Sequence, residues 1–337
     1  MSERFGIIGL GHIGGSLLQC LVDGENEVVG YDADPQTRAC AIADGYEILH
    51  RIEDVVRQST HLVLALPTPA VVATVREVAR CVDQQSTRPL LISDVASVKS
   101  TVFHDVSEIV NGLDGAVYLS LHPMAGREGS GYATADPSLF GGRIWIALAS
   151  PETTPEIVVR GSELVASCGD GLVLLDLARH DEVVALISHL PHVISFVYAS
   201  MVTQNELWPI AARVGAGSFS DLVRVAKSNP GRVREMVLPN AQRVERLLAE
   251  LEQRFDEARA VLLASMTEND RLEDLFPVNL SRSLTPEGPV VLERVVVLER
   301  SELIEALLRY CVEGWSIASI QPLHDEAGYR VVLMGKP

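Results

Sequence analysis

The stretch that decides the fold of this chain is Phe5-Gly6-Ile7-Ile8-Gly9-Leu10-Gly11-His12-Ile13-Gly14-Gly15. Its first four residues are an apolar run typical of a buried parallel strand, and residues 13–22 have the apolar spacing of a helix. The glycines therefore lie on a strand-to-helix turn, where a dinucleotide pyrophosphate meets the N–H groups and the positive dipole end of the helix. The loop residues expected to contact the dinucleotide are Gly9, Gly11, His12, Ile13 and Gly14.

A second apolar run, residues 27–31, ends in Asp32, about 20 residues after the glycine loop. A carboxylate at this position binds the adenosine ribose hydroxyls and repels a 2′-phosphate, so Asp32 favours NAD over NADP. A simpler interpretation is a glycine turn with Asp32 capping a helix. Strand, loop, helix, strand and acid nevertheless follow one another in the order that the dinucleotide motif requires, so we expect NAD as the cofactor.

The composition excludes several classes of protein. The chain has 337 residues, 47% of them hydrophobic, and a net charge of −17. Its length suffices for two domains of roughly 100–200 residues each, and its hydrophobic content excludes a largely disordered chain. The negative charge argues against nucleic acid or an anionic membrane as a partner. It would also repel an anionic substrate, which a local basic cluster would then have to capture.

The five cysteines are scattered and contain no CxxC pair, which is typical of reduced thiols in a cytoplasmic protein. No signal peptide precedes the first strand, so we expect a cytoplasmic location. The longest apolar segment, residues 183–202, contains His189, Pro191 and His192. We therefore expect a buried helix there rather than a membrane span.

The first half of the chain alternates apolar strands with amphipathic helices, which predicts a doubly wound parallel sheet of the Rossmann type in residues 1–177. The expected strands are residues 5–8, 27–31, 61–66, 90–93, 116–121, 144–148 and 172–175, and the main helices are residues 13–22, 35–44, 70–82 and 99–110. Such a sheet binds its ligand at the carboxyl ends of its strands. Pro67 and Thr68 lie at one of these ends and are further expected cofactor contacts.

Helical periodicity dominates residues 178–285, which predicts an all-helical domain. Its long apolar helices indicate a homodimer core, with a monomeric bundle as the alternative, and we expect this domain also to bind the substrate. Residues 286–337 show a βαββ pattern, with Ser301 as the expected N-cap of the helix. We find no catalytic constellation in this small α+β appendage. A structural or dimer-extending role is therefore favoured over a regulatory ligand site.

Two strand ends carry residues suited to catalysis. Ser97 follows the strand at residues 90–93, where its hydroxyl either caps a helix or faces the nicotinamide and the substrate. Lys99 would be an ordinary surface lysine if it had no role in the site. His122 leaves the next strand and precedes Pro123, which favours extended backbone and suits a general base over the nicotinamide. Taken alone, His122 is equally well explained as a structural histidine.

Two later stretches suit an anionic substrate. His189 and His192 lie three residues apart on a predicted helix that Pro191 should bend. No acidic or Cys partner has the spacing of a metal site, so we expect no metal. Residues 224–234 form a basic cluster that is either an anion site or a solvated face. Its members are Arg224, Lys227, Arg232 and Arg234.

Five motifs occur in one order over roughly residues 5–265. They are the glycine loop at 9–14, Asp-Val-Ala-Ser-Val-Lys at 94–99, His-Pro-Met-Ala-Gly-Arg-Glu-Gly-Ser-Gly at 122–131, Ser-His-Leu-Pro-His at 188–192, and Lys-Ser-Asn-Pro at 227–230 followed by Arg234. Together they resemble the prephenate/arogenate dehydrogenase family of tyrosine biosynthesis. Each motif is modest alone, whereas all five in register are highly specific.

The resemblance implies an oxidative decarboxylation. A 4-hydroxycyclohexadienyl substrate gives hydride from C4 to the nicotinamide and loses its ring carboxylate as carbon dioxide, and the ring becomes aromatic. By the family's pattern His122 accepts the hydroxyl proton, and Ser97 orients the hydroxyl or the nicotinamide. The same pattern puts His189 near the substrate. It also puts His192 and Arg234 on the substrate carboxylates, and Glu128 at the mouth of the pocket as a gate.

Arg127 departs from the family's pattern, because relatives usually carry Ser or Thr there. An added cation beside His122 would strengthen anion capture or lower the pKa of the base. In the family that the chain resembles, the acid at Glu128 is found more often among prephenate-using members, which favours prephenate as the substrate, with arogenate or an amino-deoxy analogue as alternatives. Two other interpretations are a β-hydroxyacid-type dehydrogenase with Lys227 as the catalytic lysine and a non-catalytic NAD-binding regulator. The first leaves His122 without a role, and the second predicts degraded catalytic positions that this sequence does not show.

Overall fold

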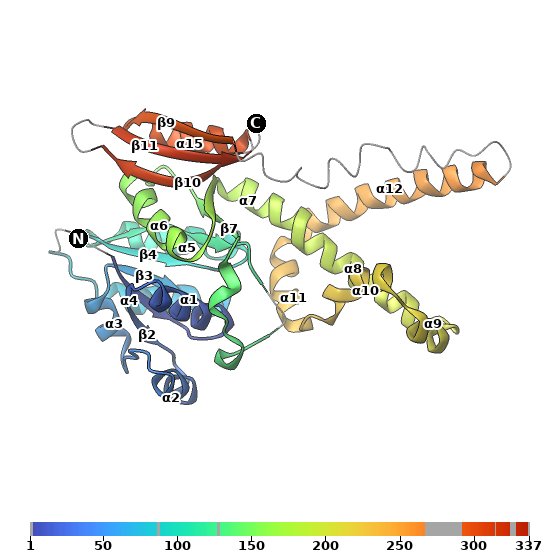
Figure 1. The fold of residues 1–337 in the computed structure, drawn as a ribbon, viewed down its shortest axis with the longest axis horizontal. Coiled ribbons are helices and arrows are strands. Elements are labelled where there is room, and N and C mark those ends of the chain that lie inside the picture. Colours follow the sequence, from blue (N-terminus) through green and yellow to red (C-terminus); the bar gives the residue numbers. More distant parts are fainter. Residues whose placement is uncertain are drawn as a thin grey trace. The chain divides into compact units, whose positions relative to one another are not determined.

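The computed structural model describes residues 3–85, 88–126, 129–266, 292–313, 315–323 and 328–335 (Figure 1). These residues form two compact units. The first unit contains the described residues up to His180 and those from Leu292 onward, and the second begins at Asp181. The predicted boundaries at 177/178 and 285/286 stay predictions. The C-terminal segment, which the sequence set apart as a third piece, groups here with the first unit.

A parallel sheet of five strands lies in the first unit. Its strands are β1 (Arg4–Ile8), β2 (Glu27–Tyr31), β3 (His61–Leu64), β4 (Leu90–Asp94) and β5 (Ala116–Tyr118), in the order β2-β1-β3-β4-β5. Beyond β2, Ile48 forms a single parallel bridge with Gly30. With this bridge counted as a strand position, the order is the 3-2-1-4-5-6 order of the dinucleotide-binding fold. The predicted Rossmann-type sheet is confirmed.

Helices pack on both faces of this sheet. One face buries Ile8, Leu62 and Leu64 against helices α3 (Ile52–Gln58), α4 (Thr68–Ala79) and α5 (Phe103–Asn111). The other face buries Phe5 and Ile7 against α1 (His12–Asp23) and α6 (Pro155–Cys168). Helix α2 (Pro35–Ala43) follows β2, as predicted, whereas the short helix α3 was not predicted. Near-continuous apolar strands are the pattern that a sheet buried on both faces requires.

A second, mixed sheet also belongs to the first unit. Its strands are β6 (Leu121–Pro123), β7 (Ile144–Leu148), β8 (Gly171–Leu175), β10 (Trp315–Pro322), β11 (Gly328–Gly335) and β9 (Leu292–Glu299), in that order. The single strand predicted at residues 116–121 is wrong, because β5 ends at Tyr118 and β6 joins the second sheet. The placement of residues 144–148 and 172–175 in the first sheet is also wrong. An apolar run predicts a strand but not the sheet that it joins, since pairing is decided by residues distant in sequence.

The predicted βαββ pattern at the C-terminus is present, and it continues the second sheet. Ile317 of β10 pairs with Leu172 of β8. Helix α15 (Leu303–Val312) packs on β8 and β10, and its N-cap is Glu302 rather than the predicted Ser301. The Tyr329 hydroxyl donates to Glu156 Oε1 of α6 at 2.6 Å. The C-terminal segment is therefore held to the rest of the first unit by sheet pairing, packing and a hydrogen bond.

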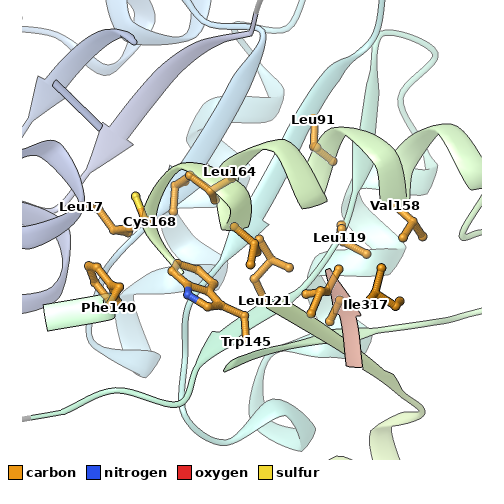
Figure 2. Close-up of a cluster of buried hydrophobic side chains, with 14 of the residues drawn as sticks. Leu17, Leu91, Leu119, Leu121, Phe140, Trp145, Val158, Leu164, Cys168 and Ile317 are labelled. Atoms are coloured by element: carbon orange, nitrogen blue, oxygen red, sulfur yellow. The ribbon is translucent and has the colours of Figure 1, made fainter. Parts of the chain in front are cut away.

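The core between the two sheets contains the largest fully buried side chain, Trp145 of β7 (Figure 2). Its ring lies 5.4 Å from that of Phe140, centroid to centroid. A Cβ on Gly169 would come within 2.7 Å of the Trp145 ring nitrogen, so this position has no room for a side chain. Leu17 and Leu164 bring α1 and α6 to the same cluster. This packing fixes the glycine turn at the start of α1 relative to the second sheet.

The second unit is all-helical over its described residues, as predicted. After α7 (Leu177–Val184) come a π-helical turn, Ala185–His189, and helix α8 (Leu190–Thr203), in which Pro191 occupies the first turn. The remaining helices are α9 (Trp208–Val214), α10 (Gly217–Val223), α11 (Pro230–Val237) and α12 (Ala241–Ser265). The π turn lies just before Pro191, where the sequence predicts a bend.

Among the described residues, one helical stretch, Leu177–Thr203, is long and apolar enough to cross a membrane by length and composition alone. Only 28% of its most apolar window is buried within the chain, so the expectation of a buried helix is wrong for a single copy. Val197 and Met201, one helical turn apart, are 64% and 62% exposed. One such helix is weak evidence for a membrane span, because helices of soluble proteins pass the same test of length and composition.

Candidate active site

The glycine loop has the backbone geometry that its sequence predicts. Gly9 has φ +93°, in the region that favours glycine, and a Cβ there would lie 2.5 Å from the Ala65 carbonyl oxygen. A Cβ on Gly14 would lie 1.8 Å from the Gly9 carbonyl oxygen. A Cβ on Gly11 would meet nothing within 4 Å, and no side chain caps α1. The loop is thus tight where strand and helix meet and open where a phosphate group would approach the first turn.

Asp32 is not a helix cap. The cap of α2 is Asp34, whose carboxylate accepts from the amides of Gln36 and Thr37. Asp32 Oδ2 instead accepts from the Leu10 amide at 2.7 Å, and Oδ1 accepts from the Asp34 amide at 2.8 Å. The half-buried carboxylate therefore joins the end of β2 to the glycine loop, at the position where a ribose-binding acid is expected.

His12 begins α1 and is buried. Its Nδ1 lies 2.8 Å from the Thr134 carbonyl oxygen and 3.0 Å from the Thr134 hydroxyl. Its Nε2 is buried and has no hydrogen-bond partner among the residues that the structure describes. A buried polar atom without a partner beside an open helix N-terminus fits a site that takes a polar, anionic group. Of the other expected cofactor contacts, Ile13 is in the same turn and Pro67 and Thr68 begin α4.

A buried ion pair lies at the carboxyl end of β4. Asp94 and Lys99 have side chains 0% exposed, and Lys99 Nζ lies 2.7 Å from Asp94 Oδ1. Asp94 Oδ2 also accepts from the hydroxyls of Tyr118, at 2.5 Å, and Ser120, at 2.6 Å. Burial alone would raise the pKa of the Asp94 carboxyl, but the Lys99 charge and the hydrogen bonds from Lys99, Ser120 and Tyr118 hold that pKa below its ordinary value.

Lys99 also reaches the strand that carries His122. Its Nζ donates to the Leu121 carbonyl oxygen at 2.6 Å, one residue before His122. The alternative of an ordinary surface lysine is therefore wrong. Ser97 lies in the loop between Asp94 and Lys99 with its side chain exposed, and the following turn begins after Val98 rather than with a Ser97 cap. The bonds of Asp94 and Lys99 anchor the backbone on both sides of the loop between these two residues and leave Ser97 at the surface.

His122 is in β6 and is 9% exposed. A hydrogen bond joins its Nδ1 to Nε2 of His180 at 2.9 Å, and His180 is fully buried at the start of α7. No role is predicted from the sequence for His180, Asp94, Tyr118 or Ser120. Asp94 stood in the strand-end motif and could have been recognised there. Nothing in the sequence joins His180 to a residue 58 positions earlier.

In the second unit, His189 is 1% exposed, and its Nδ1 lies 3.2 Å from the Asn240 side-chain nitrogen. His192 is half-buried, and its Nδ1 lies 2.8 Å from the Ser188 carbonyl oxygen. Helix α11, which packs against the π turn, carries Arg234 with its side chain exposed. The predicted Arg127 and Glu128 lie outside the described residues. No group of three His, Cys, Asp or Glu side chains in the described part of the chain could hold a metal ion.

A glycine turn that is open at Gly11, followed by an acid after β2 on a Rossmann-type sheet, defines a dinucleotide-binding protein. The family model for the prephenate dehydrogenase nucleotide-binding domain matches residues 22–174, and the model for the dimerization domain of the same family matches residues 176–277. The chain therefore belongs to the prephenate dehydrogenase family.

Three similar proteins illustrate the family. The prephenate dehydrogenase of Bacillus subtilis is 27% identical over 285 residues, which are 82% of this chain and 73% of that protein. The cyclohexadienyl dehydrogenase of Zymomonas mobilis is 30% identical over 246 residues, which are 71% of this chain and 81% of that protein. The structure of Aquifex aeolicus prephenate dehydrogenase, in complex with hydroxyphenyl propionate and NAD+, has a TM-score of 0.71 at 22% identity, covering 84% of this chain and 98% of that one.

Proposed function

We propose that this protein is an NAD-dependent prephenate dehydrogenase, which converts prephenate to 4-hydroxyphenylpyruvate in tyrosine biosynthesis. The family match and the names of the relatives support the reaction, and the NAD+ in the Aquifex aeolicus complex supports the cofactor. The observation that carries the proposal is the support of His122. Its backbone is held through Leu121 by a buried lysine and its ring is bonded to a buried histidine.

The strand topology supports placing base and cofactor together. The glycine loop follows β1, Asp32 follows β2 and Ser97 follows β4, all at the carboxyl edge of the parallel sheet. His122 lies in β6 of the second sheet, and Lys99, which follows β4, donates to the carbonyl oxygen of the residue before His122. The segment after His122 also returns to α1, because the Asp136 amide donates to the Ser16 hydroxyl at 2.9 Å. We infer that Gly9, Gly11, His12, Ile13 and Gly14, with Asp32, Pro67 and Thr68, hold the dinucleotide.

Bound NAD would supply the acceptor for the hydride that leaves C4 of the substrate. His122 accepts the proton of the 4-hydroxyl, so that electrons can move into the new carbonyl as the hydride leaves. The bond to the ring carboxylate then breaks, and its electron pair enters the ring as carbon dioxide departs. The carbonyl oxygen takes the proton back from His122, so that the aromatic product carries a phenol hydroxyl. Ser97 orients the hydroxyl. Because these groups act only if the substrate is held within reach, the substrate carboxylates need fixed cations.

For that role we propose His192 and Arg234, with His189 near the substrate. His189 is fixed by Asn240, and Arg234 offers an exposed guanidinium suited to bidentate carboxylate binding. Arg127 and Glu128 stay predictions as substrate-binding residues. We propose no metal, nucleic acid or membrane as a requirement of the reaction.

We further propose a soluble, cytoplasmic homodimer that forms through the helical unit. The family model for residues 176–277 describes a dimerization domain. The same helices expose large apolar side chains in the single chain, including Val197, Met201, Ile210 and Val214. A second copy is the partner that would bury such a face, because the other side of a two-fold interface presents the same residues. The cysteines of the chain are all free, which suits a reducing compartment.

The test offers prephenate and arogenate separately, each with NAD or NADP, and follows the absorbance of the reduced nicotinamide. We expect turnover with prephenate and NAD. Turnover with arogenate alone would keep the chemistry and change the substrate, and silence with both in a protein that binds NAD would refute the proposal. His122→Ala should lower kcat by about 10²–10⁴-fold with NAD affinity preserved, as expected for a lost general base.

A further inference from the structure

The contact between His122 and His180 has a chemical consequence that the proposed function does not include. Nδ1 of His122 and Nε2 of His180 are 2.9 Å apart, and the rings are tilted at 54° with centroids 5.1 Å apart. Both rings are buried. A hydrogen bond between two ring nitrogens needs a proton on one nitrogen and a lone pair on the other. The direction of this bond therefore decides the tautomer of His122.

Two arrangements satisfy this bond. If His180 donates, His122 carries its ring proton on Nε2 and presents a donor to the substrate. If His122 donates from Nδ1, its Nε2 has the lone pair that can take a proton from a hydroxyl. Only the second arrangement makes His122 a base. We propose that His180 is a positioning residue that accepts from His122 Nδ1 and so keeps Nε2 of His122 basic.

The second arrangement also suits the state after proton transfer. Once Nε2 has taken the hydroxyl proton, His122 is an imidazolium with N–H groups on both nitrogens. His180 Nε2 remains an acceptor for Nδ1–H, so the same bond stabilises the charge that develops during the reaction. With His180 as the donor, the Nδ1–H of protonated His122 would face the Nε2–H of His180, and the bond would be lost. The choice of the second arrangement rests on the proposed function, whereas the contact between the two rings does not.

The surrounding structure holds His180 in place. Its backbone amide donates to the Asp176 carbonyl oxygen at 3.0 Å in the first turn of α7. On the other side, the Lys99 bond to the Leu121 carbonyl oxygen fixes the backbone next to His122. A histidine that is oriented by a buried third group follows the general logic of activated bases, although here the third group is a second imidazole rather than a carboxylate.

Two matched amide variants test the inference in the full-length protein. In His180→Gln the amide lies near the former Nε2 position and can still accept from His122. In His180→Asn the amide lies near the former Nδ1 position and is too short to reach His122. We expect His180→Asn to lower kcat on the order of 10–100-fold, as for a lost orienting partner, with the KM for both substrates within a few-fold. His180→Gln should recover most of kcat. Equal kcat values in the two variants and the unmodified protein would overturn the inference.

A second measurement reads the tautomer directly. The ring ¹⁵N signals of His122, assigned by comparison with His122→Gln in ¹⁵N-histidine-labelled protein, should show Nδ1 protonated in the neutral ring. In His180→Asn we expect a mixture of tautomers. Neutral His122 with its proton on Nε2 in the unmodified protein would refute the inference. This readout needs no turnover, so a protein inactive on prephenate and arogenate would refute the proposed function while the spectrum still decided the role of His180.

Discussion

Replacing Lys99 by Met tests the support beneath His122 most directly. The substitution keeps a long apolar stem and removes the charge that lies 2.7 Å from Asp94. Both side chains are fully buried, so the remaining carboxylate would be an uncompensated charge in the core. Removal of one partner from a buried ion pair costs about 3–5 kcal/mol. The hydrogen bonds from Tyr118 and Ser120 to Asp94 persist, which places the expected loss near the lower end of that range.

The pH dependence of this loss has a defined sign. In the unmodified protein the pKa of Asp94 is held below its ordinary value, so its contribution to stability is present above the ordinary pKa and is lost as the pH falls. Without Lys99, burial would raise that pKa above the ordinary value. Protonation of Asp94 would then remove the unpaired buried charge from the variant as the pH falls. The difference in the free energy of unfolding between the two proteins should therefore shrink towards acidic pH.

The assay is urea unfolding followed by tryptophan emission in a Trp208→Phe background, because the other two tryptophans, Trp145 and Trp315, lie in the first unit. Arg57→Met is the control. Arg57 is an exposed partner of Glu53, so its loss should cost no more than about 1 kcal/mol. The double variant Lys99→Met/Asp94→Asn should recover part of the stability by removing the unpaired charge. A loss below about 1 kcal/mol for Lys99→Met, or a difference that widens towards acidic pH, would refute this account of the network.

Four further predictions test other parts of the molecule. Asp32→Asn keeps an acceptor for the Leu10 amide but removes the charge, so the ratio of kcat/KM for NAD over NADP should fall by roughly tenfold or more, and an unchanged ratio would contradict the assignment. Arg234→Ala should raise the KM for prephenate with little change in kcat, and an unchanged KM would remove Arg234 from the site. Val197→Asp puts a charge on each side of the proposed two-fold interface and should give monomers by light scattering, whereas a persistent dimer would place the interface elsewhere. Burial lowers the pKa of His61 from 6.5 to about 3, so on acidification the unfolded chain binds a proton that the folded chain does not. The free energy of unfolding should therefore fall by about 2 kcal/mol between about pH 7 and pH 5. In urea unfolding, His61→Gln should remove that part of the pH dependence.

The sequence predicts best what depends on neighbouring residues. The glycine loop, Asp32 and the helices of the second unit follow from local spacing, and the structure has each of them. The break between β5 and β6 does not follow, because Leu119 and Ser120 look no less strand-like than their neighbours. The Ile48 bridge is missed for the same reason, since a single parallel pair leaves no periodic signal. Pairing across the fold, rather than propensity, decides these features.

The site shows the same limit at the level of single side chains. A lysine in an acidic chain is expected at the surface, and only Asp94, buried at the end of β4, makes the burial of Lys99 favourable. His180 comes to His122 through the packing of α7, and no spacing in the sequence reports it. The proposed catalytic residues could therefore be named from motifs, whereas the groups that hold them could not.

Lys99 and His180 hold different parts of His122, which explains how so short a strand can position the proposed base. Strand β6 has three residues and, within the described part of the chain, pairs with β7 alone, so its ladder gives His122 little rigidity. Lys99 fixes the backbone at Leu121, and its own position is set by Asp94 at the end of the neighbouring parallel sheet. His180 fixes the ring from a helix. His122, the proposed base, is thereby tied to the sheet that carries the glycine loop, so its position relative to that loop depends on the buried ion pair rather than on the short strand itself.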